Sequence, residues 1–301
     1  MIKNNILCIK LRVISISLCF VAGLLVSAAQ ADKLPYVSQS KIRILAGPGE
    51  TVSGEITIEN PTAESKNINL YLEDWHYLHG SSGAKEFVSP NSMPYSACPW
   101  ISFTPRNIQV PPFGKQKVSY SVNIPAGAEG ARYASLFFET MVSKGVPLLK
   151  SGSYAGFDIN IRVATLFYVE VQGTVFRSGQ LNNLKVEPSQ AVGGGLDINL
   201  DFANTGNTDI ATLGEFILKN KEGAVVARGV FNNLYAFQHG KGALSSTIKE
   251  MIPPGVYGLK ITVDLGKATA EAGMGNGPVI TKEAVVTIGE NNRVIEFGEL
   301  S

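Results

Sequence analysis

The chain has 301 residues, of which 45% are hydrophobic, and its 26 basic and 25 acidic side chains nearly cancel. The first 31 residues hold three basic and no acidic side chains, so 23 basic against 25 acidic residues leave the rest of the chain at −2. This balance excludes a strongly basic face for nucleic acid and an acidic tail.

The amino terminus has the pattern of an export signal. It holds three basic residues, Lys3, Lys10 and Arg12. An apolar run follows over residues 13–26, and Ala29 and Ala31 then supply the small residues that signal peptidase reads. We predict a cleaved signal peptide over residues 1–31, with an uncleaved anchor as the alternative. No later apolar run in the sequence is long enough for an integral membrane segment.

Only Cys98 remains once the signal is removed, because Cys8 and Cys19 lie within it. The exported chain therefore forms no internal disulfide, and its stability must come from its hydrophobic core. Its length, about 270 residues, suits roughly two domains of ordinary size. We expect Cys98 to be a small buried side chain, with a reactive thiol as the alternative.

The first half of the exported chain reads as short strands separated by turns. Apolar and polar residues alternate over residues 51–59, 67–73 and 117–124. A period of two over such lengths is typical of half-buried strands, and clusters of Gly, Pro and Asn between the runs indicate turns. Many short strands with regular turn signals suggest a β-sandwich or a β-barrel.

The second half has the same character. Four runs carry strand or hairpin patterns: residues 196–202, 216–226, 256–263 and 279–288. We predict a second β-sandwich over residues 176–289 and a tail over residues 290–301, ordered in part by residues 294–297. The predicted fold class is all-β, with two tandem immunoglobulin-like β-sandwich domains after the signal peptide.

The sequence holds no convincing catalytic or metal-binding set. His76 and His79 lie three residues apart and so face opposite sides of a strand, whereas a zinc site needs three or four converging ligands. His239 stands alone in a turn, and the glycines at residues 193–195 precede no helix, unlike a phosphate loop. We predict a protein that is not an enzyme and binds no metal and no cofactor.

Three segments of the first half carry a family pattern. One is a strand with Arg43 before a short apolar run, and another is a proline-rich corner over residues 104–115 with the strand after it. The third combines residues 132–139 with residues 157–168, which end in Leu-Phe-Tyr. Together they resemble the periplasmic pilus-assembly chaperone family (PapD-like). The resemblance covers about residues 36–172 and implies two immunoglobulin-like domains set in an L.

Residues 157–163 alternate, with Phe157, Ile159, Ile161 and Val163 on one face. Alternation alone describes an ordinary strand with one face in the core. The resemblance implies a strand at a sheet edge that presents this apolar row to a client subunit and pairs with it through backbone hydrogen bonds.

The resemblance also implies two basic residues between the domains that hold the client's terminal carboxylate. Arg43 matches the first, and a solvated charge at a strand end is the alternative. The family has a lysine at the second position, where this chain has Thr165, which supplies no cation. Arg162 is the candidate substitute, three residues earlier and on the opposite face of the strand.

These observations predict a periplasmic or cell-surface chaperone-like protein. Its partner would be a secreted β-rich, pilin-like subunit, to which the resemblance adds an outer-membrane assembly protein as a possible second partner. The alternative is a structural or adhesive cell-surface protein whose immunoglobulin-like domains bind another surface component.

Overall fold

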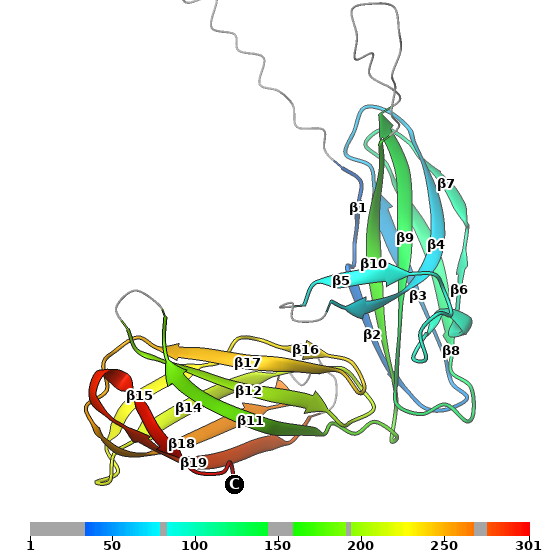
Figure 1. Ribbon diagram of the computed structural model, residues 1–301. Coiled ribbons are helices and arrows are strands. Elements are labelled where there is room, and N and C mark those ends of the chain that lie inside the picture. The colour runs from blue at the N-terminus through cyan, green and yellow to red at the C-terminus, as the bar shows by residue number, and fades with distance from the viewer. Residues whose placement is uncertain (1–33, 79–82, 144–158, 191–193, 268–275) are drawn as a thin grey trace, which may run out of the picture.

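The structure is a computed structural model that describes residues 34–78, 83–143, 159–190, 194–267 and 276–301. These residues form two β-sandwiches in tandem, set in an L (Figure 1). The predicted all-β, two-domain fold class is confirmed. The predicted signal peptide lies outside the described residues. No helix in the described part of the chain is long and apolar enough to cross a membrane.

The first domain consists of two sheets packed face to face. One sheet has the order β1 (Tyr36–Val37), β3 (Thr51–Glu59), β8 (Lys115–Asn123), β6 (Ile101–Thr104). The other has the order β2 (Lys41–Ala46), β10 (Ile159–Val171), β9 (Ala131–Ser143), β4 (Lys66–Tyr77), β5 (Lys85–Val88), with β7 (Asn107–Val110) also paired to β4. β2 runs parallel to β10, whereas β10, β9 and β4 pair antiparallel.

Alternation decides which side chains fill the first core. In β3, Ile56 and Ile58 are fully buried, and Val118 of the neighbouring β8 is buried with them. Their exposed neighbours Glu55 and Lys117 form an ion pair on the outer face, with 2.7 Å between Oε2 and Nζ. Each fully buried aliphatic side chain contributes about 1.5–3 kcal/mol to folding, so the two sheets are held mainly by this apolar layer.

The second domain is also a sandwich. One sheet is β11 (Gly179–Pro188), β12 (Leu196–Asn204), β17 (Lys241–Ile248), and a small one pairs β13 (Ile210–Ala211) with β16 (Tyr235–Ala236). The third is β15 (Val225–Val230), β14 (Leu213–Lys219), β18 (Gly255–Asp264), β19 (Val279–Ile288), β20 (Val294–Phe297). The tail therefore includes a strand, β20, and Ser301 exchanges two further backbone hydrogen bonds with Glu283 of β19.

An aromatic cluster joins the two domains. Phe237 of the second domain is 5% exposed, and its ring centroid lies 4.4 Å from that of Tyr133, 4.8 Å from Tyr77 and 4.9 Å from Trp75, all in the first domain. Tilted and edge-on aromatic pairs contribute about 0.5–1.5 kcal/mol each beyond their buried area. The cluster therefore fixes the corner of the L.

Cys98 is buried beside a carboxylate. Its Sγ lies 3.1 Å from Oδ1 of Asp74, which also accepts a hydrogen bond from the Ser96 hydroxyl at 2.6 Å. Burial and this carboxylate raise the pKa of the Cys98 thiol to about 12. A thiolate is therefore scarce at neutral pH, and the prediction of a buried side chain is confirmed.

Candidate binding edge and domain junction

β10 has two halves with different neighbours. β9 pairs with it along its length, but β2 pairs only with residues 166–171. On the side of residues 159–164 away from β9, no strand of the described chain forms a ladder. We call residues 159–164 the open edge. Its backbone groups on that side are available to another strand.

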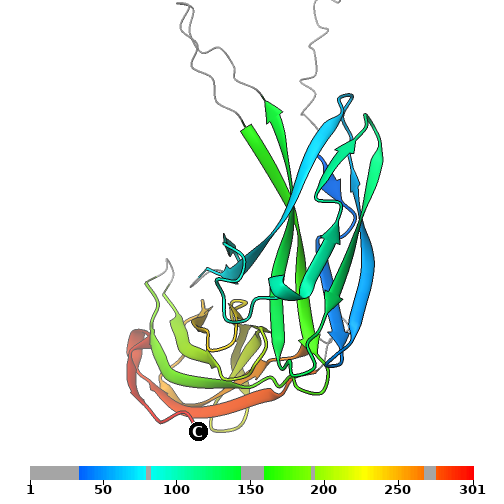
Figure 2. The same ribbon diagram turned by 90° about the vertical axis from the view of Figure 1, so that its right-hand side faces the viewer.

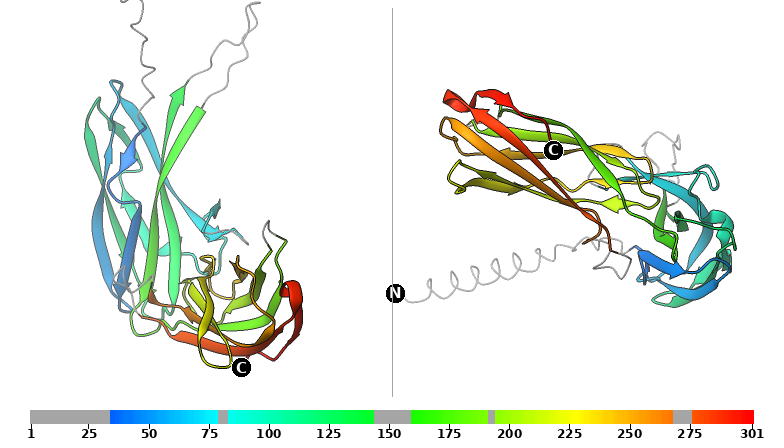
Figure 3. Two further views of the ribbon diagram at one scale, coloured as in Figure 1. Left: turned by 90° about the vertical axis from the view of Figure 1, so that its left-hand side faces the viewer. Right: turned by 90° about the horizontal axis from the view of Figure 1, so that it is seen from below.

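The predicted apolar row runs along this open edge. Ile159 is 40% exposed, and Ile161 and Val163 are half-buried, with Val163 packed against the first core. Phe157 lies outside the described residues. Figure 2 and Figure 3 show this end of β9 and β10 standing away from the other strands of the domain. The row therefore changes from core contact at Val163 to solvent contact at Ile159.

Thr165 ends the open edge and faces inward. Its side chain is fully buried, and its hydroxyl donates a hydrogen bond to the Gln39 carbonyl at 2.6 Å. Because alternate residues of a strand share a face, Thr165 lies on the same face as the buried Phe167 and away from that of Tyr168. A lysine at this position would bury its charge in the first core.

Arg43 lies on the face of β2 that looks into the angle of the L. Its neighbours Ile42 and Ile44 are in the first core, and the parallel register places Arg43 opposite Tyr168. The guanidinium carbon lies 4.5 Å from the centroid of the Tyr168 ring. Among the described residues no acidic side chain forms an ion pair with Arg43, so its N–H groups remain available to a ligand. We call this side of the sheet, with Arg43 and Tyr168, the cleft face.

Arg162 also lies on the cleft face, but it is engaged by its own sheet. Its Nη1 is 3.0 Å from Oε1 of Glu73, and its guanidinium lies 4.2 Å from the centroid of the Phe137 ring. It stands six residues along β10 from Tyr168, a distance of about 20 Å at the rise of an extended strand. The structure therefore does not bring Arg162 and Arg43 together.

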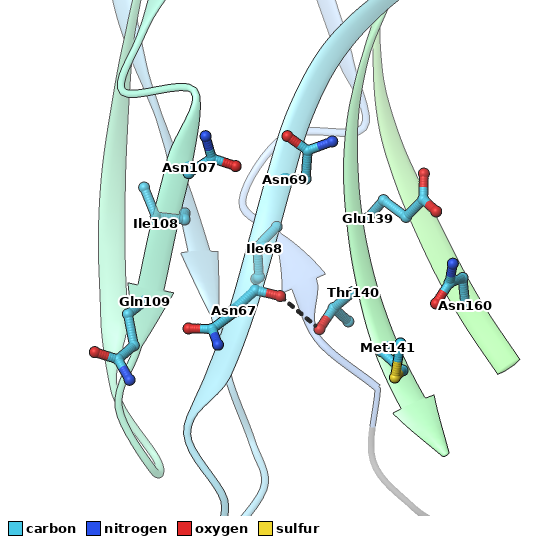
Figure 4. Close-up of a pocket in the computed structure, with 10 residues that line it drawn as sticks. All are labelled: Asn67, Ile68, Asn69, Asn107, Ile108, Gln109, Glu139, Thr140, Met141 and Asn160. Carbon is cyan, nitrogen blue, oxygen red and sulfur yellow. Dashed lines mark hydrogen bonds between the residues drawn. The ribbon is translucent and has the colours of Figure 1, made fainter. Parts of the chain in front are cut away.

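An amide-rich groove occupies the far end of the cleft face (Figure 4). Its volume is about 480 Å³, and its polar lining includes Asn67, Asn69, Asn107, Gln109 and Asn160. It forms where β4 and β9 diverge beyond the last pair of their ladder, and there the Thr140 hydroxyl donates a hydrogen bond to the Asn67 carbonyl at 2.9 Å. The amide side chains of the groove can donate and accept hydrogen bonds.

A buried carboxylate lies beneath the cleft face at the junction. Asp209 of the second domain accepts hydrogen bonds from the Tyr133 hydroxyl at 3.1 Å and from the Tyr77 hydroxyl at 3.4 Å. Burial raises the pKa of Asp209, and the positive charge of Arg43 opposes that shift. The nearby Glu170 and Arg177 form a buried ion pair that links β10 to the interdomain connection. The position of Arg43 relative to Asp209 therefore depends on how the two domains are packed together.

The described residues contain no group of three or more His, Cys, Asp and Glu side chains placed to hold a metal ion. His76 of β4 has its Nε2 3.4 Å from Oε2 of Glu86 on β5. His79 lies outside the described residues. Sequence reasoning missed the junction residues Asp209 and Phe237, which come from the second domain and belong to no periodic pattern.

No protein-family model and no curated protein matches the sequence. Solved structures of fimbrial chaperones are similar to the chain. The class 5 fimbriae chaperone CfaA is 11% identical over 83% of this chain and 98% of that one, with a TM-score of 0.45. The chaperone–tip adhesin complex CsuC–CsuE of Acinetobacter baumannii is 11% identical over 83% of this chain and 98% of that one, with a TM-score of 0.40. The chaperone CupB2 of Pseudomonas aeruginosa is 9% identical over 82% of this chain and 98% of that one, with a TM-score of 0.33. These likenesses are remote, since each TM-score is below 0.5.

Proposed function

We propose that this protein is an exported chaperone-like protein that binds a secreted β-rich, pilin-like subunit by donating the open edge of β10. The observation that carries the proposal is an unpaired strand edge with an apolar row, Ile159, Ile161 and Val163. Proteins usually protect such an edge with charges, prolines or a covering segment, because it pairs readily with other chains. An edge left open and apolar suits a protein whose task is to pair.

Binding at this edge requires no covalent chemistry. The backbone groups of residues 159–164 would form a ladder with the subunit, and the side chains of the row would enter its exposed groove. Arg43 would receive the subunit's terminal carboxylate through charge-assisted hydrogen bonds, because no acidic side chain of the described residues forms an ion pair with its guanidinium, which lies over the Tyr168 ring. The export signal predicted from the sequence would send the protein to the periplasm or the cell surface, where an outer-membrane assembly protein would take over the subunit.

The test is co-expression in a bacterial periplasm with each secreted β-rich subunit encoded beside this chain's gene. We expect a soluble one-to-one complex, measured by size-exclusion chromatography with light scattering. Ile161→Asp should abolish the complex, because an aspartate at the centre of the row cannot enter an apolar groove.

Val230→Asp is the matched control. Val230 is 73% exposed on β15, an edge strand of the second domain, so the same charge is added to a different edge. Loss of the complex in this variant but not in Ile161→Asp would assign binding to the second domain. If Ile161→Asp unfolds the first domain, Ile159→Asp tests the same row at its more exposed end. A complex that survives this second change rejects the proposal.

A further inference from the structure

A polar groove lies on the outer face of the three-stranded sheet of the second domain, where β11, β12 and β17 run side by side (Figure 1). The pairing aligns two rows of outward-facing side chains across the strands: Gln180, Ala203 and Lys241 in one, and Asn182, Asp201 and Ala243 in the next. The two alanines leave a hollow among longer polar side chains, the second-domain groove, whose volume is about 560 Å³. Small-ligand sites have volumes of roughly 300–1,000 Å³, so the groove has the size of such a site.

A β-bulge gives the second-domain groove two consecutive amides. Between two successive cross-strand pairs, β11 has two residues, Asn183 and Leu184, where β12 has one. Asn182 and Asn183 are therefore both exposed, while Leu184 returns to the core with 5% of its surface exposed. Asn183 has a φ of 53°, a left-handed conformation that asparagine adopts more readily than most residues. In a regular strand, one of these two amides would face the core.

Asp201 is oriented by the second of these amides. Nδ2 of Asn183 donates a hydrogen bond to Oδ2 of Asp201 at 2.8 Å, and no described residue donates one to Oδ1. An ionised carboxylate has about four acceptor sites, so most of the capacity of Asp201 is left for a ligand. A carboxylate beside a carboxamide offers acceptors and donors side by side. This arrangement matches two adjacent hydroxyl groups, because each hydroxyl both donates and accepts.

His239 lies at the end of the second-domain groove, in the turn between β16 and β17. Its φ of 63° is also left-handed. The buried Asn204 fixes this turn, because its Nδ2 donates hydrogen bonds to the carbonyls of Ala236 and Phe237 at 3.1 and 2.9 Å. Strained backbone that is held by surrounding contacts is concentrated at ligand sites. The exposed side chain of His239 hydrogen-bonds to no other described residue, so it is available to a ligand.

The charges of the groove offset each other. Asp201 is negative and Lys241 is positive, and Lys241 forms no ion pair with any acidic side chain of the described chain. A charged ligand would therefore meet one group of its own sign. A neutral ligand rich in hydroxyl groups meets no such repulsion and can bond to both groups, because the ammonium donates and the carboxylate accepts. Saccharides are ligands of this kind.

We propose that the second-domain groove binds a neutral saccharide. Asp201 and Asn183 bond two adjacent hydroxyls of one sugar ring. Further hydroxyls are bonded by the side chains around this pair, those of Gln180, Asn182 and Lys241. A site built to bond hydroxyls discriminates against an analogue that lacks them. Because the groove lies in the second domain and the open edge in the first, this inference stands apart from the proposed function.

The test is a nuclear magnetic resonance titration of the isotope-labelled protein with the methyl glycosides of mannose, galactose and N-acetylglucosamine. We expect at least one of the three to shift the side-chain amide signals of Asn182 and Asn183 saturably at millimolar concentration. A methyl glucoside whose hydroxyls are all methylated is the control ligand. It should leave these signals unchanged, because it has no hydroxyl to donate.

Asp201→Asn keeps the shape of the side chain and should weaken binding of the responding glycoside about tenfold, as expected for a lost charge-assisted hydrogen bond. Asp197→Asn is the matched control. Asp197 lies four residues earlier on the same face of β12, outside the groove, and its Oδ1 accepts a hydrogen bond from the Thr247 hydroxyl at 2.7 Å. Ala243→Leu should abolish binding by filling the hollow, whereas Ser245→Leu adds the same side chain two residues further along the same face of β17 and should not.

No shift with any of the three glycosides, or an equal shift with the methylated glucoside, would reject the site. Equal effects of Asp201→Asn and Asp197→Asn would reject it too, because only the overall charge of the face would then matter. Tighter binding of N-acetylneuraminic acid than of any neutral glycoside would overturn the neutral ligand in favour of an anionic sugar. Loss of the sugar response with retained subunit capture would reject this inference alone, and a sugar response without capture would reject the proposed function alone.

Discussion

The two halves of β10 carry the same alternation but have different surroundings. In the second half, Phe167 and Val169 are fully buried, because β2 and β9 flank the strand and the facing sheet covers it. In the first half, Ile159 is 40% exposed and only β9 pairs with the strand. The comparison shows that alternation identifies the residues that share a face, whereas the neighbouring strands decide whether that face is core or binding surface.

The largest effect should come from the buried half. Phe167→Ala removes a fully buried ring whose centroid lies 5.1 Å from that of Tyr120 in the facing sheet. We expect the free energy of unfolding to fall by about 3–5 kcal/mol, the usual cost of such a cavity, measured by urea denaturation. A loss below about 1 kcal/mol would mean that the two halves are less different than the structure shows.

The other face of the buried half should respond less strongly. Asp209→Ala leaves the hydroxyls of Tyr133 and Tyr77 without their shared acceptor at the junction. We expect a loss of about 1–3 kcal/mol, the cost of unsatisfied buried polar groups. Thermal unfolding followed by near-ultraviolet circular dichroism would detect it through these tyrosines, and an unchanged melting temperature would contradict it.

The pH dependence of Asp209 has a definite sign. Burial raises its pKa in the folded protein, so its protonated form favours folding below the unfolded pKa of about 3.9, and this contribution is lost as pH rises through the folded pKa. Asp209→Asn is uncharged throughout. The free energy of unfolding of the wild type, relative to that of this variant, should therefore decline from pH 4 to pH 8. Urea unfolding at each pH measures it, and a relative stability that rises with pH would contradict the prediction.

Thr165 lies at the boundary between the halves. Thr165→Val keeps the shape of the side chain but removes its hydrogen bond to the Gln39 carbonyl. We expect a loss of about 0.5–1.5 kcal/mol, as for one ordinary hydrogen bond. Hydrogen exchange at the Leu166 amide, which bonds to the Ser40 carbonyl, should quicken in the same variant. Unchanged protection would show that the hydroxyl does not hold the start of β2.

The smallest effect on stability belongs to the open edge. Ile159→Ala trims a side chain that is already 40% exposed, and we expect a change within about 0.5 kcal/mol. The same change should weaken the subunit complex, measured by its dissociation rate. A large loss of stability together with an unchanged complex would reverse the comparison between the two halves.

Several elements could be predicted from the sequence because they depend on local periodicity. The runs at residues 51–59 and 279–288 coincide with β3 and β19, where one face is buried and the other is exposed. The ends of β10 are harder to predict from the sequence. Its buried half does not alternate in polarity but is apolar on both faces from Leu166 to Val169. Alternation therefore indicates the strand over residues 159–163 but does not indicate where its buried half ends.

The candidate site could be predicted only in part. Arg43 and the apolar row come from single strands, and their motifs can be read along the chain. Arg43 meets the Tyr168 ring because β2 pairs in parallel with β10, and no spacing in the sequence predicts such a contact. Asp209 and Phe237 come from connections in the second domain, where neither side chain belongs to a periodic pattern.

By itself the sequence determined an all-β chain of two sandwiches and the strand face on which each apolar residue lies, because a period of two is a local property of extended backbone. Only the tertiary structure decided that β2 stops short of residues 159–164, that Thr165 faces the core, and that Asp209 of the second domain meets the hydroxyls of Tyr133 and Tyr77. The physical reason is that pairing and burial depend on residues distant in the chain, and an open edge exists only where a neighbouring strand ends.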